Sequence, residues 1–502
     1  MSMREIVREL PTDRDGANSR RSWSLAIICI AQLMIVLDAS VVIVALPSAQ
    51  HALHISVANR QWVVSAYTLV FGSLLLLGGR VADYVGRRRM FVIGLIGFGL
   101  ASALGGLAQN QAMLFSSRAL QGGFAAIMAP AALSILTVTF TEPHERARAF
   151  GVYGAIAGSG AAIGLILGGV LTQFASWRWT LLINTPIAIV TAVMARRVIS
   201  ESRAEKRHSY DLPGAVTSTV GFFLLVFGFT EVTSHGWGSP LTASLLAGAA
   251  VMLVSFVVIE LRAKHPLLPL RVVLDRNRGG AYLASLLVGC ALLGTFLFLT
   301  YFLQATLHYS ALRTGFAFLP FSAGIITGAT VSSRLLPRTG PRTLMVSGLT
   351  LATLGLIWFT RLGVDSTYVA HVLGAEILTS IGMGLAFVPM SSTALIGVHE
   401  EHAGVASALV NATQQIGGAL GTAFLNTVAA SAAAAFIATR INSTSVVRAA
   451  AVHGYTTAFE ISALLLASAA VVSGLMIGSK RSHAHLNLQA KLPGLNPALA
   501  IE

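Results

Sequence analysis

The sequence predicts an all-α membrane protein with about fourteen transmembrane helices. Hydrophobic residues make up 55% of its 502 residues, while charged residues make up only 11%. Apolar runs of about 18 residues or more, the length needed to cross the hydrocarbon core, recur along the whole chain. In lipid such runs satisfy their backbone hydrogen bonds only as helices or closed barrels, and runs rich in Ala, Leu, Ile and Val form helices.

The predicted spans follow one another with short polar segments between them. They cover 23–47, 61–79, 90–109, 112–138, 149–172, 178–197, 212–231, 241–261, 280–304, 313–333, 343–360, 368–397, 404–430 and 456–478. Most of the 34 Lys and Arg residues fall on one side if the N-terminus is cytoplasmic, which predicts that both termini are cytoplasmic. Arg exceeds Lys and Ala is abundant, as in high-GC bacteria, so a bacterial cytoplasmic membrane is expected.

The formal net charge of +14 does not indicate a nucleic-acid binder. A nucleic-acid binder gathers its basic residues on one soluble face, whereas here they are spread over short segments between apolar runs. The two cysteines, Cys29 and Cys290, both lie in apolar spans and predict no disulfide framework.

The chain contains an internal repeat. Three glycines recur at one common displacement, Gly151, Gly164 and Gly168 as Gly404, Gly417 and Gly421. This displacement pairs spans one to six with spans nine to fourteen in the same orientation, an arrangement found in transporters with a binding site between the halves. The predicted organisation is an N-terminal cytoplasmic segment 1–22, a six-helix half 23–197, a linker with two extra helices 198–262, a second six-helix half 263–479 and a cytoplasmic tail 480–502. Because the cavity lies between two halves of one chain, a monomer is expected.

Asp38 lies inside the first apolar span. An ionisable group at the centre of a span costs on the order of 3 kcal/mol or more, so it indicates an ion or substrate pathway. At 1.5 Å per residue, Asp38 lies about 13 Å and Arg118 about 10 Å from the outer ends of their spans. Proton binding to Asp38 would then release Arg118, and the alternative is a permanent structural ion pair.

A second group of polar residues is predicted to line a substrate cavity. Glu376 lies in the second half, within one or two positions of the place that corresponds to Arg118, where it would attract a cationic substrate or carry a second proton. The other candidates are Tyr67, Asn184, Asn411, Gln414 and Gln415. Helix–helix hydrogen bonding is the alternative role for each of them.

The segment GGRVADYVGRRRM, between the second and third spans, is a tight cytoplasmic turn. Gly79 and Gly86 permit unusual dihedral angles and close packing. Asp83 can cap a helix or pair with arginine, and Arg87 and Arg88 anchor the turn at the headgroups. Topogenic charge alone does not explain two glycines and an aspartate at these spacings. The segment resembles the loop motif G-x-L-A-D-x-x-G-R-R of the major facilitator superfamily, and it is predicted to be a gating loop.

Other segments resemble the fourteen-span drug:proton antiporter branch, the EmrB/QacA-like family, over about residues 20–480. They include LDASVVIVALP, QWVVSAYTL and SWRWTLLINTP. The resemblance implies a gate relay at Asp83 and Arg87 and a role in proton coupling for Arg118. It also implies an antiporter motif on the fifth helix, with Gly154, Gly158, Gly164, Gly168 and Gly169. Leu165 replaces the usual proline of that motif, and Tyr84 replaces a residue that is often basic.

The sequence and this resemblance together predict a proton-coupled antiporter that exports hydrophobic or cationic drugs by alternating access. The alternative within transport is an exporter dedicated to one antibiotic or metabolite. An intramembrane enzyme or sensor is the competing class, but no nucleophile elbow or His/Cys cluster supports it. No phosphate-binding loop is present, so the proton is the expected coupling ion and no cofactor or metal is expected.

Overall fold

The computed structural model describes residues 14–203, 211–263, 266, 273–395, 400–440 and 443–478. Within these ranges the regular structure is helical, with two π-helical turns and no strand. Most of the predicted N-terminal segment and cytoplasmic tail, and part of the linker, lie outside them. The all-α class predicted from composition is therefore confirmed.

Helices of the first half pack in a fixed set of pairs. They are α2 (Arg14–Ala52), α3 (Trp62–Val85), α4 (Arg87–Gly106), α5 (Gln111–Thr139), α6 (Pro143–Phe174), α7 (Trp179–Leu182) and α8 (Asn184–Val198). α2 packs against α6, α5 packs between α3 and α4, and α8 packs against α4. Asn110 begins α5 as its N-cap, because its side chain accepts a hydrogen bond from the Met113 N–H at 2.9 Å.

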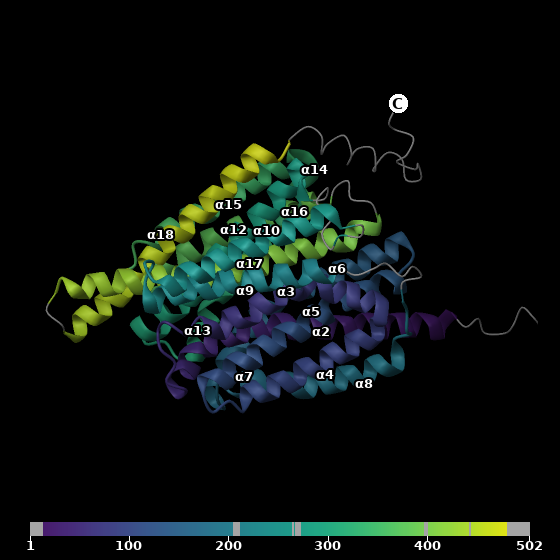
Figure 1. Cartoon of the computed structure of the whole chain (residues 1–502), viewed down its shortest axis with the longest axis horizontal. Helices are drawn as coiled ribbons and strands as arrows, with labels where there is room; N and C mark the ends of the chain where they lie inside the picture. The colour runs from purple at the N-terminus through teal and green to yellow at the C-terminus, as the bar shows by residue number, and fades with distance from the viewer. Residues whose placement is uncertain are drawn as a thin grey trace, which may run out of the picture.

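The second half repeats this pairing. Its helices are α12 (Arg276–Tyr301), continued by η1 (Phe302–Thr306), α13 (Ala311–Ala317), α14 (Leu319–Thr339), α15 (Pro341–Phe359), η2 (Tyr368–Val372), α16 (Leu373–Leu395), α17 (Glu400–Ala438) and α18 (Thr444–Met476). α12 packs against α17 as α2 does against α6, and α16 packs between α14 and α15 as α5 does between α3 and α4. Figure 1 shows the two sets of helices as adjoining layers, with one end of α17 and α18 reaching beyond the rest.

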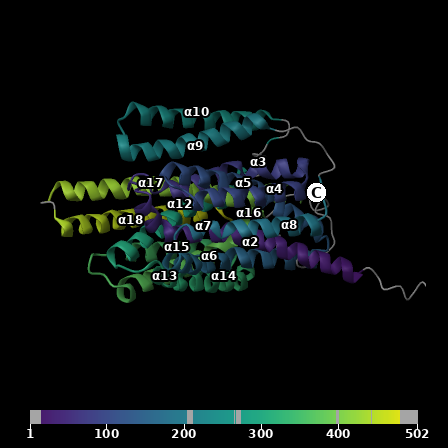
Figure 2. The ribbon, with the colours of Figure 1, turned by 90° about the horizontal axis from the view of Figure 1, so that it is seen from below.

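Two further helices, α9 (Leu212–His235) and α10 (Pro240–Arg262), form a hairpin beside the two layers (Figure 2). α9 contacts α3 and α17, whereas α10 packs mainly against α9. Asp211 caps α9 by accepting a hydrogen bond from the Gly214 N–H at 2.8 Å. The hairpin therefore packs where the two halves meet, and it belongs to neither six-helix half.

Eleven of the described helices are long and apolar enough to cross a membrane. Three shorter apolar helical segments, Trp62–Leu75, Ile163–Phe174 and Pro213–Phe229, coincide with other predicted spans. The number fourteen therefore stays a prediction. The helix of the last predicted span, 456–478, extends further toward the N-terminus, because Ser443 caps α18 through the Val446 N–H at 3.3 Å and the helix begins at Thr444.

Candidate functional site

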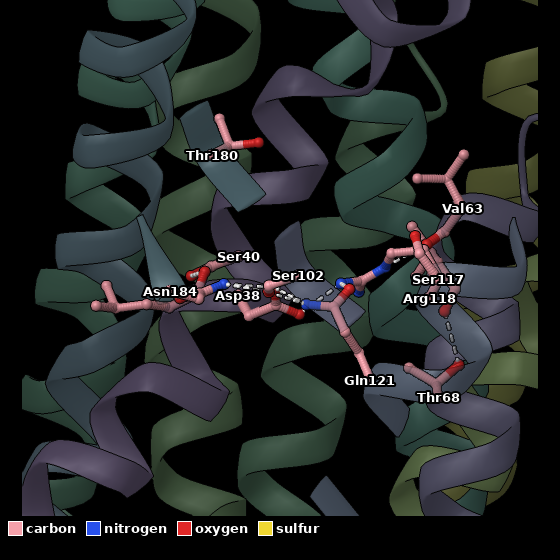
Figure 3. A network of polar contacts seen from close by, with 12 residues as sticks. Asp38, Ser40, Val63, Thr68, Ser102, Ser117, Arg118, Gln121, Thr180 and Asn184 are labelled. Atoms are coloured by element: carbon pink, nitrogen blue, oxygen red, sulfur yellow. Dashed lines mark hydrogen bonds and ion pairs between the residues drawn. The ribbon is translucent and has the colours of Figure 1, made fainter. Parts of the chain in front are cut away.

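A buried polar network surrounds Asp38 at the centre of the first half (Figure 3). Asp38 from α2 meets Arg118 from α5, with 2.5 Å between Oδ2 and Nη1. Its other oxygen, Oδ1, accepts hydrogen bonds from Gln121 Nε2 at 2.8 Å and Asn184 Nδ2 at 2.9 Å. Both amides also donate to the Ser102 hydroxyl of α4, at 2.5 and 3.2 Å. Each of the five residues is at most 1% exposed.

The hydrogen bonding of this network suits an ionised carboxylate. Three donors converge on Asp38, which has no proton to donate when ionised. The NH₂ groups of Gln121 and Asn184 each have two protons and two acceptors, Asp38 and Ser102. Every amide proton of the pair therefore has an acceptor. Protonation of Asp38 would remove the negative charge that pairs with Arg118, which is the only cationic partner among these donors.

Arg118 also ties the network to α3. Its Nε donates to the Val63 carbonyl oxygen at 3.0 Å, in the first turn of that helix. Its guanidinium lies over the ring of Tyr67, 4.5 Å from the ring centroid, a favourable cation–π distance. The Tyr67 hydroxyl is buried without a hydrogen-bond partner among the described residues.

The structure thus brings together Asp38, Arg118, Asn184 and Tyr67, which the sequence analysis assigned to two different sites. Asn184 holds Asp38, and in this conformation neither Asn184 nor Tyr67 has more than 1% of its surface exposed. Gln121 was missed, although its position three residues after Arg118 places both on one helix face.

Three predicted cavity residues lie on α17, which packs against α3 and α12. Asn411 is exposed, and Gln414 and Gln415 are half-buried. The backbone of α17 at Gln414 approaches α12 closely, because a Cβ at Gly289 would lie 2.2 Å from the Gln414 carbonyl oxygen. Their predicted contact with a substrate stays a prediction.

Glu376 is fully buried in the second half, at 0% exposure. The side chain is therefore closed to solvent in this conformation, and its predicted place in a substrate cavity stays a prediction. Its Oε2 lies 3.1 Å from the Tyr368 hydroxyl, and Oε1 has no hydrogen-bond partner among the described residues.

Two glycines of the predicted antiporter motif, Gly164 and Gly168, lie on the face of α6 that packs on α2. A Cβ at Gly164 would lie 1.9 Å from Ser40 Oγ, and one at Gly168 would lie 2.8 Å from the Val41 carbonyl oxygen. Both contacts lie within one turn of Asp38 on α2. The glycines therefore let α6 approach the helix that carries the buried carboxylate.

The next glycine on α6 faces the other half of the protein. A Cβ at Gly169 would lie 2.8 Å from the Ala311 carbonyl oxygen at the start of α13. Leu165, which replaces the usual proline, is buried and packs at the same crossing of α6 and α13. Gly154 and Gly158 lie on α6, but their surroundings are outside the described part of the structure.

The predicted gating loop is held by Glu201, which the sequence analysis did not single out. Gly86, with φ +129°, separates α3 from α4, a conformation that favours glycine. The Arg88 and Arg89 N–H groups each donate to the Glu201 carboxylate at 3.1 Å, and Arg87 N–H donates to Ser202 O at 3.0 Å.

This carboxylate lies at the positive end of the α4 dipole, where a negative charge is stabilising. Arg88 also pairs with Glu201 at 3.7 Å between Nε and Oε2. Gly79 packs against Pro130 of α5, because a Cβ at Gly79 would lie 3.3 Å from the Pro130 Cβ. The Asp83 side chain lies outside the described residues, so its predicted relay with Arg87 stays a prediction.

A second polar cluster joins the two halves at the end that carries residues 53–61 and 302–310, which we term the outer end because the predicted topology places it outside the cell. Arg60, 5% exposed, donates from Nε to Asn426 Oδ1 at 3.1 Å and lies 4.1 Å from the Tyr301 ring centroid. Asn426 Nδ2 donates to Gln61 Oε1 at 2.5 Å, and Tyr301 donates its hydroxyl proton to Gln50. No carboxylate lies within ion-pair distance of Arg60 in the described ranges.

The chain belongs to the major facilitator superfamily, whose family model matches residues 28–422. It is 48% identical over 468 residues to the puromycin resistance protein of Streptomyces alboniger, with 93% of each chain covered. It is 42% identical over 424 residues to the cephamycin export protein of Amycolatopsis lactamdurans, covering 84% of this chain and 87% of that one.

A solved structure has the same fold. It is the crystal structure of a bacterial homolog of the human lysosomal transporter Spinster, in an inward-facing and unoccupied conformation. It matches with a TM-score of 0.64 and 17% identity, over 91% of this chain and 97% of that one. The chain is therefore a multi-pass membrane transporter and not an enzyme, as the sequence predicted.

Proposed function

We propose that this transporter exports one antibiotic, or a narrow class of antibiotics, across the bacterial cytoplasmic membrane in exchange for protons. Support for the substrate class comes from the relatives, since those with 48% and 42% identity are named for puromycin resistance and cephamycin export. They favour the dedicated exporter over the broad multidrug pump that the sequence analysis put first. The chain would act as a monomer with both termini in the cytoplasm.

The observation that supports proton coupling is the buried Asp38–Arg118 pair. A proton arriving from outside would bind an Asp38 oxygen and remove the negative charge that holds Arg118. An uncompensated guanidinium in a low-dielectric interior is unfavourable, by several kcal/mol. Arg118 would therefore move, and its bond to Val63 O in α3 would break.

The conformation described here fits the inward-facing half of such a cycle. At the outer end Asn426 of α17 bonds to residues just before α3, and the tight crossing of α6 and α13 joins the halves again. Movement of α3 away from Arg118 would loosen the first of these contacts. A lipophilic or cationic substrate would then leave on the outer side, and loss of the proton to the cytoplasm would reset the pair.

The proposal is tested in inverted membrane vesicles with puromycin and a cephamycin as probes. An imposed proton gradient should drive accumulation of at least one probe, and Asp38→Asn should abolish it. Glu145→Gln is the matched control, because Glu145 is an exposed carboxylate paired with Arg21 and should leave transport unchanged. Gradient-driven transport that survives Asp38→Asn would remove Asp38 from the coupling mechanism.

The breadth of the substrate range needs a separate experiment. Expression in a susceptible host, followed by a growth-inhibition panel of unrelated antibiotics and lipophilic cations, should show protection against one structural class. Protection against several unrelated classes would instead favour the multidrug alternative.

A further inference from the structure

We propose that Glu376 is a second proton-binding site and that its carboxyl group carries a proton in the conformation described here. The part that this proton plays in transport rests on the proposed function. Its presence on Glu376 rests on local hydrogen bonding, and it is testable without any transport measurement.

The first argument is a count of protons around Tyr368. The Tyr368 oxygen lies 2.7 Å from the Ala317 carbonyl oxygen and 3.1 Å from Glu376 Oε2. A tyrosine hydroxyl has one proton, and a carbonyl oxygen can only accept. The shorter distance assigns that proton to Ala317, whose carbonyl at the end of α13 needs a donor. Glu376 can then bond to Tyr368 only by donating a proton of its own.

The second argument is the surroundings of the carboxyl group. Glu376 is 0% exposed, and its Oε1 has no hydrogen-bond partner among the described residues. The backbone N–H of Phe321, in the first turn of α14, faces the carboxyl group and favours its charged form, but the loss of hydration on burial outweighs this contact. An ionised carboxylate with an unsatisfied buried oxygen is strongly unfavourable, whereas the neutral acid avoids most of that desolvation cost.

No cation offsets this burial within the described ranges. The helices packed on α16 are α12, α14, α15 and α17, with η2 before it, and Tyr368 of η2 is the titratable side chain that contacts Glu376. The guanidinium of Arg313 lies over the Tyr309 ring at 3.8 Å, and Tyr309 lies beside Tyr368 with 6.3 Å between ring centroids. Arg313 therefore stacks on a ring next to Tyr368, and no ion pair between Arg313 and Glu376 is found among the described residues.

Asp38 provides an internal comparison. Both carboxyl groups are buried, but Asp38 accepts from three donors, one of them cationic, whereas Glu376 has no cationic donor. Arg118 and Glu376 also occupy similar places on equivalent helices. Arg118 lies about two turns after the start of α5, and Glu376 lies about two turns after the start of η2, which leads directly into α16. The first half thus neutralises its charge with an ion pair, and the second half does so with a proton.

Tyr368 also supplies a route for that proton. Its side chain is half-buried, while Glu376 behind it is fully buried. When a proton from water reaches the Tyr368 oxygen, the hydroxyl proton can pass to Glu376 Oε2, and the reverse sequence returns it to water. For this transfer the hydroxyl must turn from the Ala317 carbonyl oxygen to Glu376, and the tyrosine stays neutral because its oxygen gains one proton as it gives up another.

Infrared difference spectroscopy of the purified full-length protein tests the assignment. At neutral pH the wild type should show the carbonyl stretch of a protonated carboxylic acid, and Glu376→Gln should remove it. Glu145→Gln should leave the band unchanged. Tyr368→Phe should retain the band but slow its shift on hydrogen–deuterium exchange. A band that persists in Glu376→Gln, or no such band in the wild type, would overturn the proposal.

A second measurement avoids any loss of folding in the variants. Dicyclohexylcarbodiimide reacts with protonated carboxyl groups in apolar surroundings, so peptide mass spectrometry of the treated wild type should find the adduct on Glu376. An adduct on Asp38 and none on Glu376 would contradict the assignment.

In vesicles, the number of protons exchanged per substrate should fall by one in Glu376→Gln while gradient-driven export persists. An unchanged ratio would show that the proton is structural and would remove Glu376 from coupling. Loss of wild-type export would instead count against the proposed function and leave the spectroscopic result in place.

Discussion

The strength of the Asp38–Arg118 pair can be measured with a double-mutant cycle. The variants are Asp38→Asn, Arg118→Gln and the combination of both. In Asp38→Asn, three donors would face a side chain that has one acceptor oxygen and two N–H groups of its own. Arg118 would keep its charge while it stays about 1% exposed, without a counter-ion.

The expected magnitudes follow from this burial. Removal of one partner of a buried ion pair typically costs about 3–5 kcal/mol, because the other charge is left uncompensated. Replacement of both partners by neutral groups is often much less destabilising. The coupling energy between the two positions should therefore be about 3 kcal/mol or more. For comparison, interhelical hydrogen bonds in membrane proteins average about 0.6 kcal/mol.

The assay is equilibrium unfolding in mixed micelles of a mild detergent and dodecyl sulfate. The matched control is the cycle for Arg21 and Glu145, an exposed pair at 3.2 Å. That pair should couple by about 0–1 kcal/mol and weaken with added salt. If the buried pair couples by less than about 1 kcal/mol, like the exposed one, the reasoning from burial is refuted.

Three further variants test other contacts. Gly164→Val should lower the midpoint of thermal unfolding, because a Cβ there would lie 1.9 Å from the nearest oxygen of α2, whereas Gly123→Ala, with nothing closer than 3.7 Å, should not. Glu201→Gln should destabilise by about 1 kcal/mol or less in the same unfolding titration, less so at high salt, and no effect would argue against capping of α4. Asn426→Ala should increase maleimide labelling of a Thr422→Cys reporter in a cysteine-free background, and unchanged labelling would exclude Asn426 as an outer-end contact.

Sequence reasoning located the charges but not all of their partners. Asp38 and Arg118 were singled out because a charge in an apolar span is rare and depth follows from residue count. Ser102 could not be found, because one serine in an apolar helix carries no pattern. Asn184 was identified as an interior polar group but assigned to a cavity, since its contact with Asp38 depends on how α8 packs beside α2 and α4.

The same limit explains why the partner of the gating loop, Glu201, could not be predicted from the sequence. Glu201 lies more than a hundred residues after Gly86, in a charged segment that reads as a linker. Only the path of the chain after α8 brings its carboxylate to the N-terminus of α4. Local patterns therefore predicted which residues are unusual, and the tertiary structure determined which of them meet.

The first turn of α3 connects the two polar clusters of the molecule. Val63 accepts the Arg118 bond, and Arg60, three residues earlier, carries the contact with Asn426 across the halves. If protonation of Asp38 releases Arg118, the outer end must loosen, and by reciprocity a loosened outer end must weaken the contact between Arg118 and Asp38. Lower pH should therefore raise maleimide labelling of the Thr422→Cys reporter in the otherwise wild-type protein, but not in Asp38→Asn. If labelling does not change with pH in either protein, the two clusters are independent, and α3 does not couple protonation of Asp38 to opening of the outer end.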